Sequence, residues 1–141
     1  MACRMGAATY GEQRQRLEAT LGPGRTTKLD NYSGHWILYP RAALYVGYLK
    51  LKGEERAIAL VTQSSRYRTP SGVGVGTSVA ELRKRVKIAC NGDGFVDGKP
   101  KFPNPNPDDC SYPRDQTQHP FTDFKIVANR VSEVAIFPGG D

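Results

Sequence analysis

The chain has 141 residues, enough for one compact domain with a substantial apolar core. Its 38% hydrophobic and 24% charged residues are typical of a globular protein, and its 15 glycines and 10 prolines favour sheets and turns over long helices. No apolar run reaches the roughly 20 residues that cross a bilayer, so we expect no membrane span, while the net charge of +6 makes an anionic partner worth weighing.

The N-terminal segment carries the first cysteine and the first helix signal. Residues 1–5 have no apolar signal core, and Cys3 is either an unpaired thiol in a tail or the remnant of a lipidation site. Thr9 and Glu12 have the spacing of an S/T-x-x-E capping box, which satisfies free backbone donors at a helix start. The pattern predicts a short, strongly charged helix over residues 13–21 that stops at residues 22–24 (GPG).

Three strands are expected in the rest of the first half. The first contains Trp36 and Tyr39 and precedes Arg41. Residues 44–51 and 56–62 then form a hairpin, because the turn between them contains a glycine that adopts positive φ at little cost.

A connector and a second helix open the other half. Residues 66–72 are rich in turn formers and separate the halves. Ser78 and Glu81 form a second S/T-x-x-E pattern, which predicts a charged helix that continues to Ala89 and stops at residues 91–94 (NGDG).

Cys90 and Cys110 flank an insert, residues 92–109, that is rich in Gly, Pro and Asp and is expected to be a poorly packed loop. A disulfide between them would contribute about 3 kcal/mol in the chain-entropy model and would indicate an oxidising compartment. The alternative is a pair of reduced thiols in a cytoplasmic protein.

The second half repeats the organisation of the first. The tripeptide Tyr-Pro-Arg at residues 39–41 recurs at residues 112–114, and a second hairpin is expected from residues 121–127 and 131–137. We therefore predict an α+β fold of two tandem αβββ repeats, residues 1–70 and 71–141, that form one antiparallel sheet with helices packed on one face.

Motifs for catalysis or metal binding are weak. The glycines of residues 72–76 lack the G-x-G-x-x-G register and the lysine of a P-loop, and residues 91–98 lack the third ligand and the distal Glu of a calcium loop. The two histidines, His35 and His119, stand apart from any metal-ligand spacing. We expect no cofactor, no metal and no enzymatic activity, although a hydrolase that uses a cysteine or His119 stays open.

Aromatic and basic residues of the predicted strands and connector are the candidates for binding, because Tyr, Trp and Arg dominate protein-interface energetics. The alternative is that half of these rings lie in the core, since side chains alternate along a strand. The candidates are Trp36, Tyr39, Arg41, Tyr45, Tyr48, Arg66, Tyr67, Arg68, Tyr112 and Arg114.

Each half resembles the small secreted fold of the β-lactamase inhibitor protein and of the SmpA/OmlA outer-membrane assembly lipoproteins. The residues that carry the resemblance are the helix entry at 76–82 (GTSVAEL), the helix exit at 21–23 (LGP), Trp36 and Tyr39, and the strand at 56–60 (RAIAL). The resemblance implies a curved antiparallel sheet that holds another protein. This chain differs in having about one helix per unit and in being duplicated without a visible signal.

These patterns favour a non-catalytic, extracytoplasmic or secreted protein-binding module, inhibitor-like in character, that uses one open sheet face. The first alternative is a nucleic-acid or anionic-polymer binder. The positive excess lies entirely in residues 1–70, where 11 Lys or Arg stand against 5 Asp or Glu, whereas residues 71–141 have 9 of each. The partner protein and the oligomeric state are left open.

Overall fold

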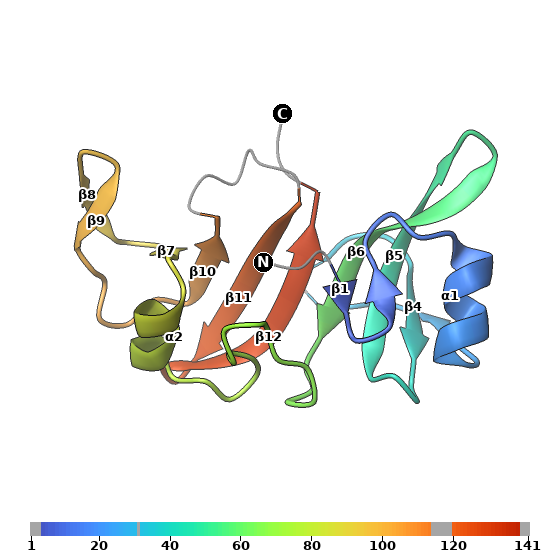
Figure 1. Cartoon of the computed structure of the whole chain (residues 1–141), viewed down its shortest axis with the longest axis horizontal. Coiled ribbons are helices and arrows are strands. Elements are labelled where there is room, and N and C mark those ends of the chain that lie inside the picture. Colours follow the sequence, from blue (N-terminus) through green and yellow to red (C-terminus); the bar gives the residue numbers. More distant parts are fainter. Residues whose placement is uncertain (1–3, 31, 114–119, 139–141) are drawn as a thin grey trace.

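The computed structural model describes residues 4–30, 32–113 and 120–138. About 47% of the structure is strand and 12% is helix (Figure 1). In chain order the elements are β1 (Arg4–Met5), β2 (Ala8–Thr9), α1 (Arg14–Leu21), β3 (Arg25–Thr27), β4 (Trp36–Tyr39), β5 (Leu44–Leu51), β6 (Glu54–Thr62), α2 (Val79–Arg85), β7 (Ala89–Cys90), β8 (Gly94–Val96), β9 (Lys99–Phe102), β10 (Asp109–Tyr112), β11 (Phe121–Val127) and β12 (Arg130–Phe137).

One antiparallel sheet of eight strands dominates the molecule, in the order β3-β4-β5-β6-β12-β11-β10-β7. The first half of the chain contributes four neighbouring strands and the second half the other four. They meet where β6 pairs with β12, with Thr62 opposite Val134 and Leu60 opposite Ile136. Whether one half is a copy of the other stays a prediction.

The two long hairpins form where the sequence predicts them. β5 pairs with β6 and β11 pairs with β12, each through a two-residue turn. Lys52 and Gly53 have φ of 52° and 83°, and Ala128 and Asn129 have φ of 51° and 61°. Positive φ at both turn residues matches the right-handed twist of the paired strands.

The predicted α+β class, in which two αβββ repeats form a sheet with a packed layer of helices on one face, is wrong. The protein is mostly β, because each half adds a short strand to the main sheet, β3 or β7, and a two-stranded sheet of its own, while the two described helices have only eight and seven residues. Each helix buries only two side chains, Leu17 and Leu21 in α1 and Val79 and Leu82 in α2. Neither is long enough to form a layer over eight strands.

The two predicted helix starts have different outcomes. Ser78 caps α2 by accepting a hydrogen bond from the Glu81 N–H at 3.2 Å. In contrast, α1 begins after Gln13, which makes no side-chain cap, and Thr9 and Glu12 bond to each other in a turn that follows β2. Backbone bonds to Ala57 hold Gly11 and Glu12 against β6, so this segment cannot enter the helix.

The insert at residues 92–109 is also more ordered than predicted. β8 and β9 form a separate two-stranded sheet, and Asp97 and Gly98, at φ of 53° and 74°, make its turn. Asp93, whose side chain is fully buried, anchors the base of the insert through two bonds from Arg83, at 2.7 and 3.1 Å. Burial opposes the charge of this carboxyl, but the bonds from Arg83, Asn104 and Cys90 lower its pKa overall.

The predicted disulfide is confirmed. Cys90 of β7 and Cys110 of β10 are paired residues on adjacent strands, with an S–S distance of 2.06 Å. The bridge closes the insert and fixes the outer edge of the sheet. Cys3 lies outside the described residues.

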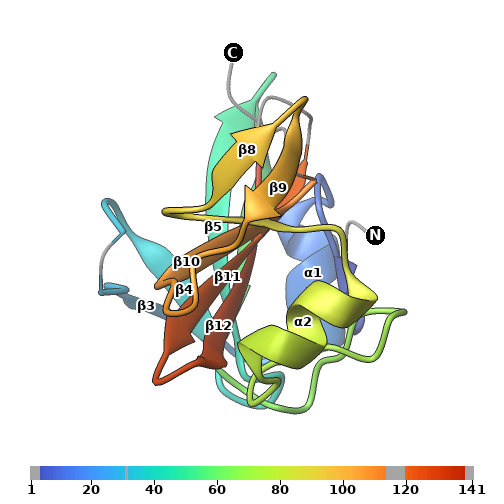
Figure 2. The same ribbon diagram turned by 90° about the vertical axis from the view of Figure 1, so that its left-hand side faces the viewer.

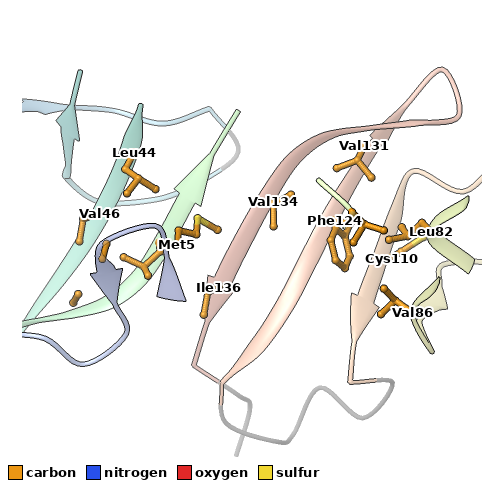
Figure 3. Packing of buried hydrophobic residues seen from close by; sticks show 14 of the residues in the cluster. Met5, Leu44, Val46, Leu82, Val86, Cys110, Phe124, Val131, Val134 and Ile136 are labelled. Carbon is orange, nitrogen blue, oxygen red and sulfur yellow. The ribbon is translucent and has the colours of Figure 1, made fainter. Parts of the chain in front are cut away.

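The sheet has two chemically different faces. One, which we call the core face, carries the main apolar cluster, including Leu44, Val46, Phe124 and Ile136 (Figure 3). Buried residues of both helices and Met5 of β1 belong to the same cluster, and both helices lie on this side of the sheet in Figure 2. The opposite side, the far face, carries a smaller cluster to which neither helix contributes.

Candidate binding surface

The predicted binding residues do not form one site. Trp36 and Tyr45 belong to the far-face cluster, whereas Tyr39 and Tyr48 pack on the core face. Arg41 and Arg66 are exposed near the turn between β4 and β5. The remaining members are Tyr67 and Arg68 in the connector, Tyr112 at the end of β10, and Arg114, which lies outside the described residues, as does His119.

Tyr39 and Tyr48 are structural rather than exposed. Tyr39 is fully buried, and its hydroxyl lies 2.7 Å from that of Tyr48. The Arg14 guanidinium lies 5.2 Å from the centre of the Tyr48 ring and pairs with Glu18 and Glu55. Burial raises the pKa of both tyrosines. This group attaches α1 to the sheet.

Arg41, Arg66 and Tyr67 attach the connector to the turn after β4. Arg66 Nη1 donates to the Arg41 carbonyl at 2.8 Å, and the Tyr67 hydroxyl donates to the Ala42 carbonyl. Farther along, Arg68 Nη1 donates to Thr77 Oγ1 at 3.1 Å. The first two bonds therefore lie within the first half, and only the bond from Arg68 to Thr77 joins the two halves.

The far face instead carries a row of aromatic rings. The Tyr32 ring lies 5.5 Å from Trp36 and 5.3 Å from Phe137, and Phe137 lies 6.0 Å from Phe121, all in tilted geometries. Tyr45 packs against the same cluster. Trp36 is buried at 6% exposed, whereas the other four rings are partly exposed, so an apolar contact surface extends across β5, β12 and β11.

The segment between β3 and β4 folds onto this face. Leu29 is buried against Trp36, and the Tyr32 N–H donates to the Leu29 carbonyl at 3.1 Å. The indole Nε1 of Trp36 donates to the Ser33 carbonyl at 3.2 Å. The segment therefore supplies Tyr32 as a fixed part of the row, while His35 is exposed.

A buried carboxylate lies beside the aromatic row. Glu133 of β12 is 6% exposed, and it accepts bonds from the Tyr32 hydroxyl at 2.7 Å and from Gln63 Nε2 at 3.0 Å. Burial, followed by the bond to Glu133, raises the pKa of Tyr32. The phenol therefore stays protonated and fixes the position of the carboxylate.

Two more carboxyl groups, Asp109 of β10 and Asp123 of β11, are hydrogen-bonded to each other on the same face. Burial, together with the neighbouring Asp109, raises the pKa of Asp123 to about 8. Burial also raises the pKa of Asp109, and the positive charge of Lys125 opposes the rise in both. At neutral pH the pair therefore retains one proton, because two adjacent carboxylates in a poorly solvated site cannot both ionise easily.

Lys125 is the positive group of this cluster. It lies opposite Asp109 and Glu133 in the strand register, and its Nζ is 5.4 Å from the centre of the Tyr32 ring. One lysine beside three carboxyl groups leaves the surface able to accept a further positive charge.

Sequence reasoning missed Tyr32, Asp109, Asp123 and Glu133. The signal was present in the last hairpin, where Phe121, Asp123 and Lys125 alternate with buried residues along β11. The pairing of Lys125 with Glu133 does not follow from the turn, because a regular hairpin would pair Lys125 with Ser132 and an irregularity after Lys125 shifts the register by one residue. No local pattern places Tyr32, because its segment reaches the far face only through tertiary contacts.

The fold and surface together define a mostly antiparallel β protein with one face filled by the core and the other lined with aromatic and carboxyl groups. Comparison with protein-family models, curated proteins and solved structures finds no match to this chain. Within the described residues, no helix is long and apolar enough to cross a membrane, and no group of three His, Cys, Asp or Glu side chains could hold a metal ion.

Proposed function

We propose that this protein is a non-catalytic protein-binding module and that the far face of its sheet is the binding surface. The observation that supports this most directly is the row of partly exposed rings, Tyr32, Tyr45, Phe121 and Phe137, on a face to which neither described helix contributes buried residues. Such rings bury a large contact area at a small cost in side-chain entropy.

The carboxyl groups beside the rings favour a partner with a basic side chain. Asp109 and Asp123 are partly exposed on this face and share one negative charge at neutral pH. An Arg or Lys of the partner would meet this pair, beside the Glu133 carboxylate that Tyr32 and Gln63 hold in place.

The Cys90–Cys110 bridge supports an extracytoplasmic location, because disulfides persist in oxidising compartments. It also argues against a cysteine hydrolase, since neither bridged sulfur is a free nucleophile. The resemblance to the β-lactamase inhibitor protein and to the SmpA/OmlA lipoproteins stays a proposal, and it agrees with the use of a sheet face to hold another protein.

The test is affinity capture from the native secreted or envelope fraction with matched variants. Tyr45→Asp/Phe121→Asp places charge on the far face, whereas Phe95→Asp/Phe102→Asp places it on exposed rings of the separate β8–β9 sheet, at 48% and 68% exposed. We expect the wild-type protein and the second variant to retain the same partner and the first variant to lose it.

Both variants must unfold at temperatures close to the wild type for the comparison to count. The proposal is wrong if the far-face variant retains the partner, or if only the Phe95/Phe102 variant loses it.

A second candidate function, binding of an anionic polymer, is favoured by one feature of the opposite side. Arg68, Arg85 and Arg130 line a recess of about 270 Å³ with Glu81 as its acidic residue. Binding of this kind releases counterions, so it should weaken steeply with salt. Absence of retention on a heparin column at low salt would remove this candidate.

A further inference from the structure

A cavity of about 340 Å³ lies on the core face where the two halves of the sheet meet. Its floor is formed by β6, β12 and β11, through the cross-strand pairs Thr62–Val134 and Thr122–Ile136. Its size is at the small end of ligand pockets, which span roughly 300–1,000 Å³.

Two segments from opposite ends of the first half form the walls. Met5 of β1 and the next residue, Gly6, form one wall. Residues 67–70 of the connector, together with Val73, form the other wall. Figure 1 shows β1 beside β6 and β12, and Figure 3 shows Met5 near Val134 and Ile136. The walls touch where Gly6 meets Tyr67, because a Cβ at Gly6 would lie 2.7 Å from the Tyr67 ring.

The lining separates into an apolar interior and a positive rim. Met5, Val73, Val134 and Ile136 are at most 6% exposed. Arg4 and Arg68 are exposed at the rim, and no Asp or Glu among the described residues lines the cavity. Neither arginine forms an ion pair with a described carboxylate, and the one bond from Arg68 to Thr77 leaves most of its five donors for another acceptor.

The geometry points to a binding site for a small amphipathic carboxylate, a function separate from the protein contact proposed for the far face. The apolar body of the ligand occupies the interior over Val134 and Ile136. Its carboxylate lies between Arg4 and Arg68, because the guanidinium fork matches a carboxylate in a bidentate arrangement. Thr62 contributes no donor of its own to the ligand, since its hydroxyl already donates to the Ala43 carbonyl.

Calorimetric titration of the whole protein with three ligands of equal alkyl length tests which head group the cavity binds. Octanoate should bind saturably, octanol more weakly, and octylammonium without saturation. Amide chemical shifts measured with octanoate should change at Gly6, Val73 and Val134, which lie around the cavity.

Variants of neighbouring arginines test the rim. Arg68→Gln and Arg4→Gln should each weaken octanoate binding about tenfold or more, because each removes a charge-assisted hydrogen bond. Arg66→Gln is the matched control, since Arg66 is exposed two residues from Arg68 but does not line the cavity. It should leave the affinity unchanged.

The inference is overturned by any of three results: no saturable binding of octanoate at millimolar concentration, equal binding of octanoate and octylammonium, or equal weakening by Arg66→Gln and Arg68→Gln. Chemical-shift changes confined to the far face would also overturn it. The first three results leave the proposal of a far-face binding surface untouched, because they concern the cavity on the core face alone.

Discussion

The two faces of the sheet are built from the same strands but have opposite roles. Along β11, Thr122, Phe124 and Ile126 point to the core face and are buried, whereas Asp123 and Lys125, between them, are only partly covered on the far face. The core face is covered by pieces from the whole chain, including β1, the connector and both helices. Among the described residues, the far face is covered by the short segment that contains Leu29 and Tyr32.

This difference separates stability from binding within one sheet. Apolar burial on the core face stabilises the fold, which frees alternate positions on the same strands for aromatic and carboxyl groups. The account therefore predicts large stability losses from core-face substitutions and small ones from far-face substitutions.

The largest effect is expected at Phe124, and Phe121 on the same strand is its matched control. Phe124→Ala leaves a cavity under a fully buried ring and should lower the free energy of unfolding by about 3–5 kcal/mol. Phe121→Ala removes the same atoms from a partly exposed position and should cost about 1 kcal/mol. Urea unfolding of both variants measures the difference, and similar losses would contradict the assignment of faces.

Removing the disulfide should have the next largest effect. The double variant Cys90→Ser/Cys110→Ser releases a crosslink across 20 residues and should lose about 2–4 kcal/mol. Unfolding of the wild type under reducing conditions should show the same loss. If neither treatment changes stability, the bridge does not hold the outer edge of the sheet.

The Asp109–Asp123 pair should make the free energy of unfolding depend on pH. Folded Asp123 keeps its proton to pH about 8, whereas in the unfolded chain it loses the proton near pH 4. The folded state therefore binds more protons between these values. The stability that this proton contributes to the folded state is fully present below pH 4 and is lost as the pH rises towards 8.

Asp123→Asn tests this pH dependence, because the amide has nearly the shape of the protonated carboxyl but does not titrate. The variant should match the wild type in stability near pH 4 and be more stable than the wild type at pH 8. Unfolding midpoints measured across this range give the comparison. A constant difference between the two proteins would contradict a shared proton.

The smallest effect is expected from Tyr32→Phe. The change removes one hydrogen bond to Glu133 and should cost about 1 kcal/mol. Tyr45→Phe is the control, since the Tyr45 hydroxyl has no hydrogen-bond partner among the described residues, and it should have no measurable effect. Equal stabilities of the two variants in urea would show that Glu133 does not depend on Tyr32.

The sequence predicted the parts of the fold that depend on local signals. Both long hairpins follow from alternating strands joined by turns that accept positive φ, and the disulfide follows from two cysteines around a turn-rich insert. The Ser78 cap is likewise a local pattern that the structure contains.

Predictions failed where tertiary contacts decided the conformation. Backbone pairing with Ala57 moves the start of α1 past Thr9, and four bonds to Asp93 order the base of an insert predicted to be a loose loop. The predicted aromatic residues were spread over both faces, because alternation along a strand cannot say which face is covered. Regular alternation along β5 puts Tyr45 on the far face and Tyr48 on the core face, and the register irregularity falls on β6, where Ile58 is the extra residue.

Hydroxyl-radical footprinting of the protein in complex with its captured partner tests the far-face claim most directly. The account predicts that Tyr45 and Phe121 are protected in the complex, while Phe95 and Phe102 of the β8–β9 sheet stay as reactive as in the free protein. Protection of Phe95 or Phe102 with unchanged reactivity at Tyr45 and Phe121 would contradict it.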